Sequence, residues 1–345
     1  MSSGKRGGMK PALTLLSMAA VLATAATGAQ AQTALGSGGA PSPGNYSIQN
    51  ASLFGAAQSA VTENFVQNTM RCDAFGLNGF CTSAGLTYLN NVGQADGHNY
   101  QGTFNLAYRI TPNWSVGFGY QGPNYHLNVN GADVSSDDNT FGLFVEYGNR
   151  LRQGVFARAA IAYQQGNATI GRSYPVGSGN GYSVGTAGIG QKEISTQAGY
   201  VFIVQNNVAI MPYAGIDYQH SSIDAYSETG GANPASFSGV SQNNLFGTLG
   251  VNGSLNLGGR AIVTAGFKHI QRLNSTADPI SANISGVGNV TAEAASNERW
   301  NEATLNLQFE GPARGSRINL QYGHTFGSSP GVPRDIAAVS FSMGF

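Results

Sequence analysis

Charge is scarce in this chain of 345 residues. Lys and Arg number 17 and Asp and Glu also number 17, so charged residues make up 10% of the sequence, against about 25% in an ordinary soluble domain. Hydrophobic residues supply 41% and aromatic residues 10%, enough apolar material for an ordered fold. Without a basic excess the chain has no polybasic footprint for nucleic acid or anionic lipid. The composition therefore excludes a typical cytosolic enzyme and a basic nucleic-acid binder.

Long apolar runs are absent after the first thirty residues. No later segment offers about 18 consecutive apolar residues, so no transmembrane helix is expected. The N-terminal residues have the three parts of a secretory signal, namely a basic stretch with Lys5, Arg6 and Lys10, an apolar stretch over 11–27, and a small-residue pattern over 29–31. We therefore expect residues 1–31 to be a cleaved signal peptide.

The expected cleavage site lies between Ala31 and Gln32. Ala29 and Ala31 are the small residues that a signal peptidase selects. Removal of the leader takes three of the 17 basic residues and leaves 14 against 17 acidic residues, a net charge of −3. The chain is thus predicted to be exported, and any residence in a membrane must use another route than a helix.

Motifs of catalysis and of cofactor binding are also missing. The sequence contains no Gly-x-Ser-x-Gly, no phosphate-binding loop and no His-Glu-x-x-His. The five histidines have no metal-ligand spacing; they are His98, His126, His220, His269 and His324. We predict that the chain is not an enzyme and that it has no catalytic, cofactor or metal residues.

The sequence does contain a period-2 alternation that continues to the C-terminus. In residues 100–110 one face carries Tyr100, Phe104, Leu106 and Tyr108, and the alternate positions are mostly polar. The same pattern recurs in segments of about ten residues over 114–120, 141–147 and 155–163. Strict alternation predicts strands with one apolar and one polar face.

The breaks between these strands alternate between short and long. The short breaks have three to five residues and lie at 111–113, 150–153, 205–207, 257–259 and 311–315. The long breaks are rich in Gly, Ser and Asn and lie at 130–138, 167–189, 222–241 and 273–297. Short turns at one end and long loops at the other are typical of an outer-membrane β-barrel, in which the apolar face contacts lipid and the polar face lines the lumen.

Parity predicts the number of strands. Counting back from the last strand gives eleven strands that begin near residue 98, and residues 79–91 supply a twelfth at period two. An even number places both ends of the barrel on the periplasmic side. The last strand ends in the alternating residues Phe341, Met343 and Phe345, and an aromatic C-terminus resembles the assembly signal of bacterial outer-membrane barrels. The predicted fold is thus an all-β, antiparallel, up-and-down transmembrane barrel of about 12 strands with a short N-terminal helix.

Three segments resemble the translocator β-domain of autotransporters, the type V secretion family. Residues 211–218 (MPYAGIDY) resemble its middle strand, residues 113–120 (NWSVGFGY) its early hairpin, and residues 339–345 (VSFSMGF) its closing strand. The resemblance implies a 12-stranded barrel in the Gram-negative outer membrane, a helix threaded through the pore, and an N-terminal passenger at the cell surface. It also implies partners, namely outer-membrane lipid, periplasmic chaperones and the barrel-assembly machinery.

The segment before the barrel is short for this family. Residues 79–345 form the predicted barrel domain, so only residues 32–78 follow the signal peptide, and we expect little or no passenger domain. Within them, residues 51–70 have an apolar stripe at helical spacing and form a candidate pore helix. A periplasmic cap or a mobile arm is the alternative for this helix. For the whole chain, the alternatives are a passive pore for small solutes and a surface adhesin or structural barrel whose long loops contact an unknown ligand.

Charges within the predicted strands mostly have lumen parity. Glu146 and Arg158 flank the 150–153 turn and are expected side by side inside the barrel, where pairing lowers the cost of desolvation. A network that holds the strands together is the expected role, with ion selectivity as the alternative. The set is Arg109, Glu146, Arg158, Asp217 and Lys268.

Cysteine is nearly absent. Cys72 and Cys81 are the only two and lie close to the first predicted strand. An isolated pair in an oxidising compartment usually forms a disulfide. We expect this bond to fix how the chain enters the barrel, with two free buried thiols as the alternative.

Overall fold

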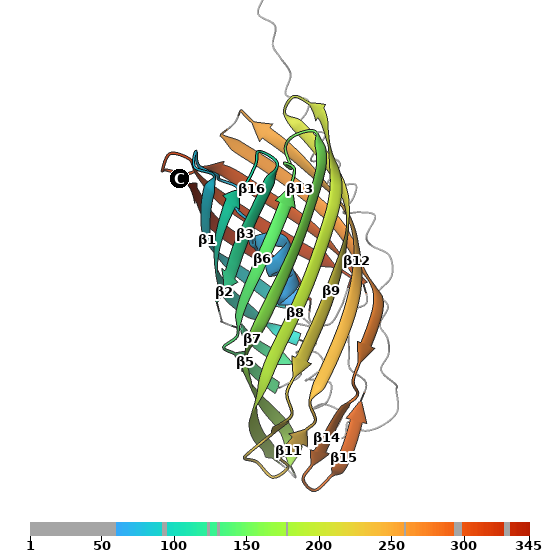
Figure 1. Ribbon diagram of the computed structural model, residues 1–345. Coiled ribbons are helices and arrows are strands. Elements are labelled where there is room, and N and C mark those ends of the chain that lie inside the picture. The colour runs from blue at the N-terminus through green and yellow to red at the C-terminus, as the bar shows by residue number, and fades with distance from the viewer. Residues whose placement is uncertain are drawn as a thin grey trace, which may run out of the picture.

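The protein is a closed antiparallel barrel of twelve strands (Figure 1), which confirms the predicted fold class. The computed structural model describes residues 60–91, 95–122, 125–129, 132–176, 179–258, 260–292, 299–327 and 332–345. The barrel strands are β1 (Phe80–Asn91), β2 (Ala95–Arg109), β3 (Trp114–Gln121), β6 (Asn139–Tyr147), β7 (Gly154–Val176), β8 (Gly179–Gln205), β9 (Val208–Ile223), β12 (Val240–Leu257), β13 (Ala261–Ala277), β16 (Arg299–Glu310), β17 (Ser316–Phe326) and β18 (Asp335–Gly344).

The first and last strands close the sheet. β1 pairs with β18 in an antiparallel register that runs from Cys81 opposite Gly344 to Asn90 opposite Asp335. β1 also pairs with β2, so the expected twelfth strand over 79–91 is present and has a neighbour on both sides. Each barrel strand thus pairs with the next around the ring, which leaves no open edge.

The apolar residues of the alternation point away from the barrel axis. Leu143, Ile161 and Ile194 are cross-strand neighbours on β6, β7 and β8, and their exposed fractions are 54%, 50% and 52%. Their chain neighbours Ala160, Ala162 and Glu193 are buried on the inner side. Apolar residues outside and small or polar residues inside are what a barrel in lipid requires.

The two ends of the barrel differ. One end, here the turn end, joins strands by short connections at 110–113, 148–153, 206–207, 258–260 and 311–315, as expected from the sequence. The C-terminus lies at this end (Figure 1). The opposite loop end has the long connections, and these contain further strands.

The prediction of four long loops was wrong in its detail. Residues 167–189 are not a loop, because β7 and β8 continue as one hairpin as far as Val176 and Gly179, beyond their neighbouring strands (Figure 1). Gly, Ser and Asn are common here, yet the paired backbones and the inward residues Ile170 and Ile189 suffice for strands. The 130–138 break contains β5 (Ala132–Ser136), which pairs with β4 (Tyr125–Val129) and with β7.

A second, four-stranded sheet lies at the loop end (Figure 1). We call it the cap sheet; it consists of β10 (Tyr226–Ser227), β11 (Ala235–Phe237), β14 (Ile280–Ile284) and β15 (Gly288–Ala292). It arises from the predicted loops 222–241 and 273–297. These segments were predicted as loops because their strands have only two to five residues, too few for a period to show.

An apolar cluster fills the loop end of the lumen. It joins residues of the cap sheet, of the β7–β8 hairpin and of the inner faces of β1 and β18, and we call it the loop-end cluster. Its larger members are Val61, Leu89, Val134, Ile170, Ile189, Ile223, Tyr226, Phe237, Ile280, Ile284 and Ile336. The prediction of a polar lumen therefore fails at this end, where the inner face becomes apolar because a folded sheet covers it.

A buried ion pair connects the cap sheet to the barrel. The guanidinium of Arg172 on β7 donates to the Glu228 carboxylate at 2.5 and 2.9 Å, and both side chains are almost fully buried. Glu228 also accepts a hydrogen bond from the backbone of Ala235, so it joins β10 to β11. Burial, with the Glu228 charge nearby, raises the pKa of Tyr226. Desolvation makes such a pair costly unless hydrogen bonds compensate. Here Glu228 accepts from Arg172 and from Ala235, and Arg172 Nη2 also donates to the Asn233 carbonyl.

We expect a charge on the outer face to destabilise the barrel. Ile161→Arg places a cation in the hydrocarbon layer and should lower the free energy of unfolding by about 2–4 kcal/mol. The matched control is Val287→Arg, a similarly exposed position in the turn between β14 and β15, which should change it by less than about 0.5 kcal/mol. Equilibrium unfolding by urea in lipid vesicles measures both, and equal effects would contradict a lipid-facing position for Ile161.

Candidate functional site: the helix inside the barrel

A short helix precedes β1 and lies inside the ring of strands (Figure 1). It is helical from Ala60 and ends in the wider π-helical turn η1 (Phe65–Thr69). Phe65 and Val66 are completely buried. Of the predicted pore helix 51–70, residues 51–59 lie outside the described residues. The same holds for the predicted signal peptide and its cleavage site at Ala29, Ala31 and Gln32.

The apolar side of the helix packs on a wall of small residues. Phe65, Val66 and Met70 form one cluster with Ala107, Phe144, Ala160 and Ala162 of β2, β6 and β7. Gly119 and Gly142 lie in the same wall on β3 and β6. A Cβ at Gly119 would lie 2.5 Å from Met70 Cγ, and one at Gly142 would overlap the Met70 sulfur. The abundant inward Gly and Ala of these strands thus form the groove in which the helix lies.

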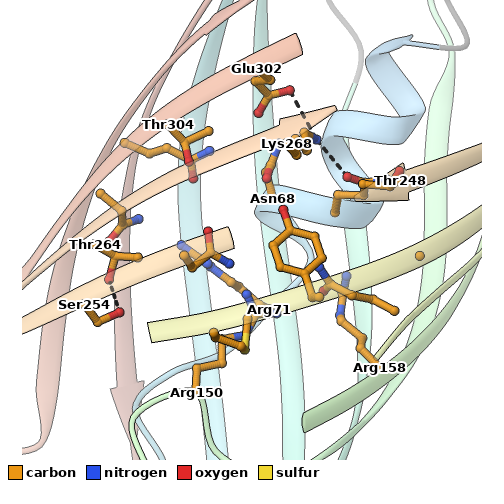
Figure 2. Close-up of a pocket in the computed structure, with 18 of the residues that line it drawn as sticks. Asn68, Arg71, Arg150, Arg158, Thr248, Ser254, Thr264, Lys268, Glu302 and Thr304 are labelled. Atoms are coloured by element: carbon orange, nitrogen blue, oxygen red, sulfur yellow. Dashed lines mark hydrogen bonds and ion pairs between the residues drawn. The ribbon is translucent and has the colours of Figure 1, made fainter. Parts of the chain in front are cut away.

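The polar side of the helix contacts charged residues on the opposite wall. Lys268 Nζ on β13 lies 2.8 Å from Gln67 Oε1 and 3.8 Å from the Glu63 carboxylate. The same ammonium lies 3.2 Å from Glu302 on β16 (Figure 2). Thr62, by contrast, donates to Gln164 on β7 of the small-residue wall at 2.8 Å. The apolar and polar faces of the helix therefore contact two different walls of the lumen.

Two inward side chains bind the end of the helix. Arg158 on β7 donates to the Val66 carbonyl and, at 2.5 Å, to the Met70 carbonyl, and Asn105 on β2 donates to Thr69 O at 3.0 Å. The last carbonyls of a helix lack partners within the helix, and a basic side chain there stabilises them. Arg158 lies 3.2 Å from Glu146, its register partner on β6, and is thereby held in place.

A cavity of about 150 Å³ remains beside the helix, on the side of the turn end. Polar side chains from both walls line it (Figure 2), among them Asn68, Arg71, Arg150, Ser195, Thr264 and Thr304. The inward amides Gln197, Asn306, Gln308 and Gln321 also line this space rather than binding the helix. A polar cavity of this size has room for water molecules.

The predicted lumen charges lie at different levels of the barrel. Glu146, Arg158 and Lys268 surround the helix, and Asp217 on β9 accepts a hydrogen bond from Thr248 at 3.3 Å. Arg109 lies apart from them at the turn end, with its guanidinium 4.2 Å from the centre of the Phe75 ring.

Three buried acids inside the barrel were missed in the sequence, in addition to Glu228 at the cap sheet. Glu193 and Glu302 have lumen parity on β8 and β16, and Glu302 is the register partner of Lys268, so parity alone could have identified both. Glu63 lies on the helix, where only the threaded arrangement shows that it faces Lys268.

The chain between helix and barrel is held to the sheet. A disulfide joins Cys72 to Cys81, with their Cα atoms 6.0 Å apart, and both side chains are buried. Ser83 on β1 donates to Arg71 O at 3.1 Å. These contacts connect the end of the helix directly to the first strand.

The terminal residues of β18 lie at the seam of the barrel. Phe345 stacks on Phe80, the first residue of β1, with ring centres 6.3 Å apart. Phe341 faces outward and is 39% exposed, and Met343 is the register partner of both Thr82 and Ser316. The predicted assembly signal thus belongs to the strand that closes the sheet.

The described residues contain neither a metal-binding cluster nor a helical membrane span. No group of three or more His, Cys, Asp or Glu side chains there is arranged to hold a metal ion. No helix in this part of the chain is long and apolar enough to cross a membrane.

A comparison with known protein families agrees with the barrel fold and its threaded helix. The family model named autotransporter beta-domain matches residues 80–323. The chain belongs to the autotransporter β-domain family. Barrels of this family lie in the Gram-negative outer membrane and are assembled there by the barrel-assembly machinery.

Solved structures with the same fold include translocators and a channel. The translocator domain of autotransporter NalP from Neisseria meningitidis is similar with a TM-score of 0.66 and 14% identity, over 87% of this chain and 99% of that one. The β domain of the Bordetella autotransporter BrkA has a TM-score of 0.51 and 12% identity, over 77% of this chain and 98% of that one. The CymD monoaromatic hydrocarbon channel has a TM-score of 0.50 and 10% identity, over 78% of this chain and 89% of that one. Among curated protein sequences none matches this chain.

We expect Arg158 to be required for a stable plugged barrel. Arg158→Met leaves the Val66 and Met70 carbonyls without their donor and leaves Glu146 with Arg150 as its remaining cation. It should lower the free energy of unfolding by about 3 kcal/mol. The control is Arg317→Met, because Arg317 also has lumen parity but contacts Gln308 instead of the helix; its loss should cost less than about 1 kcal/mol. Denaturant unfolding in micelles measures both, and equal losses would contradict the assigned role.

We expect Cys72 and Cys81 to form a disulfide in the exported protein. Maleimide applied to the denatured protein without reductant should modify neither residue, and with reductant it should modify both. Closing so small a loop contributes on the order of 2–3 kcal/mol by chain entropy, so Cys72→Ser with Cys81→Ser should lower stability by about that amount. Labelling of both thiols without reductant would refute the bond.

Proposed function

We propose that this barrel anchors, at the cell surface, the segment that precedes the lumen helix, and that the helix plugs the pore once that segment has passed. The single observation that supports this most strongly is the direction of the chain inside the lumen. Val61 belongs to the loop-end cluster, whereas Gly76 contacts the backbone of Gly344 and Phe345 near the turn end. The described chain therefore runs through the lumen from the loop end at Val61 to the turn end at Gly76.

In this proposal the loop end faces the outside of the cell. Outer-membrane barrels have short periplasmic turns and longer external connections, and the C-terminus lies at the turn end. Export by the signal peptide, with cleavage after Ala31, forms part of the same proposal. The segment from Gln32 to the helix is then the part held at the surface, and the function is mechanical, without catalysis.

The alternative of an open pore for small solutes has less support. The CymD channel shares the fold alone at 10% identity. A 12-stranded barrel is wide enough inside for about one helix, since diameter grows with strand number and eight strands are filled by side chains. Here the helix occupies the middle of the lumen and the loop-end cluster occupies its loop end.

An adhesive role is the second candidate function, and the cap sheet is the observation that favours it. This sheet is folded and held by the buried Arg172–Glu228 pair. Its exposed surface carries small polar side chains in cross-strand contact, such as Ser227 with Ser236 and Asn283 with Asn289. A folded surface of this kind could be recognised together with the anchored segment.

We expect the full-length protein to conduct ions weakly in planar bilayers and a variant without residues 32–70 to conduct severalfold better. Removing the helix empties the middle of the lumen and takes Val61 out of the loop-end cluster, which loosens the second barrier. The matched control lacks only residues 32–59 and keeps the described helix. It should conduct as weakly as the full chain.

A folding control accompanies these recordings. Heat-modifiable migration on gels shows that each variant is still a folded barrel. Equal conductance of the full chain and the 32–70 deletion would mean that the helix does not plug the pore, and the translocator proposal would then lose its main support.

A further inference from the structure

The outward faces of the barrel strands carry six basic side chains, and all six lie toward the loop end. Four of them lie near the loop-end limit of their own strand. The other two, Lys192 and His269, are the register partners of residues near that limit, His220 and Asn301. We call them the basic belt; they are His98 on β2, Lys192 on β8, His220 on β9, His269 on β13, Arg299 on β16 and His324 on β17.

The turn end has no counterpart of this belt. In the described barrel strands, the basic residues nearest the turn end, Arg109 and Arg317, have inward parity, and no Lys, Arg or His faces outward there. Outward aromatic residues, by contrast, occur at both ends, for example Trp114 and Tyr200 at the turn end and Tyr100 at the loop end. Aromatic girdles mark both membrane interfaces of such barrels. The basic residues therefore distinguish one leaflet from the other, which an ordinary interfacial position does not explain.

Three of the histidines are anchored in the same way. Nδ1 lies 2.8 Å from a side-chain oxygen on the neighbouring strand, namely Asn243 for His220, Asn301 for His269 and Asp335 for His324. An amide or carboxylate oxygen accepts, so Nδ1 is the donor in each pair. The other ring nitrogen, Nε2, has no hydrogen-bond partner among the described residues.

Two of the side-chain oxygens that bind these histidines also accept a hydrogen bond from a tyrosine. Tyr218 donates to the same Asn243 oxygen at 2.7 Å, and Tyr322 donates to the same Asp335 oxygen at 2.8 Å. The imidazole rings are thus held in one orientation before any ligand binds, which lowers the cost of binding.

Cross-strand register brings belt residues together in two places. Lys192 is the register partner of His220 on β8 and β9. At the seam, one lateral row runs from His324 through Asp335 and Asn90 to His98 across β17, β18, β1 and β2. Arg334, just before β18, lies 3.2 Å from Asp335 and adds a further cation to this row.

We propose that the basic belt binds the phosphate groups of the lipopolysaccharide headgroup in the outer leaflet. Phosphate accepts charge-assisted hydrogen bonds from ammonium, guanidinium and protonated imidazole groups, and a basic side chain near an anionic membrane surface favours binding. The inference uses the proposed orientation, in which the loop end faces outside. The small net charge of the chain gives no sign of this site, because the belt depends on parity and position and not on the number of basic residues.

The test measures lipid binding by the full-length barrel in micelles. The probe is purified lipid A with both phosphates, compared with the same lipid after its phosphates are removed and with phosphatidylglycerol. We expect the diphosphorylated lipid to bind at least tenfold more tightly than either comparison lipid. The double variant Lys192→Gln with His220→Gln should bind it about tenfold more weakly than the unaltered chain.

The matched control is Arg260→Gln with His126→Gln. It likewise removes one permanent cation and one histidine. Arg260 lies in a turn at the turn end, and His126 lies on β4, where it pairs with Asp133. This variant should keep full affinity, and heat-modifiable migration should show both variants folded. Unchanged affinity in the belt variant, an equal loss in the control, or equal binding of phosphatidylglycerol by the unaltered chain would each overturn the proposal.

Surface biotinylation of whole cells separates this inference from the proposed function. Labelling of a Cys introduced at Val287, on the cap sheet, supports the orientation that both share. If it stays unlabelled while a Cys at Leu151 in the 148–153 turn is labelled, the loop end is periplasmic. Both the outer-leaflet assignment and the proposed function then fail, whereas weak lipid A binding by a correctly oriented barrel would overturn the belt alone.

Discussion

Closure of the backbone hydrogen bonds is the constraint on which the rest of this structure depends. In lipid no water is present to satisfy an unpaired amide, so the sheet must end where it began. The β1–β18 seam fulfils this requirement, and the alternation of outward apolar and inward small or polar residues follows from it. A closed ring of twelve strands also creates a lumen that side chains alone do not fill. The helix, the charged wall and the loop-end cluster are three different ways in which this chain fills that space.

The lumen is layered along its length. The loop end is apolar, the middle combines a small-residue groove with a charged wall, and the turn side keeps a polar cavity. Each layer has a partner on the helix segment, since Val61 belongs to the first, Glu63 and Met70 lie in the second, and Asn68 lines the cavity of the third. A threaded segment therefore finds partners for both of its faces at only one depth and one rotation.

The barrel could be predicted from the sequence because its cause is local. Period two along each strand determines which residues face lipid, and the short turns determine which strands are neighbours. The Glu146–Arg158 register follows from the turn between them. The β7–β8 extension and the cap sheet could not be predicted, because short Gly- and Ser-rich strands become stable only through partners distant in sequence. The pair Arg172–Glu228 is separated by 56 residues, and no local pattern relates the two. The contact of Glu63 with Lys268 likewise requires knowledge of which segment lies inside the ring.

The seam also has a consequence for the synthesis and folding of the protein. Its two strands are the first and the last of the barrel, and Asn90 and Asp335 bond across it although 245 residues separate them. Until the final strand is synthesised and delivered, β1 keeps an exposed edge of unpaired amides, which is a template for pairing with other chains. Contacts between such distant segments form slowly, because loop closure must precede them. A nascent or truncated chain is therefore not a slightly weaker barrel but an open sheet, whose free edge can pair with other chains.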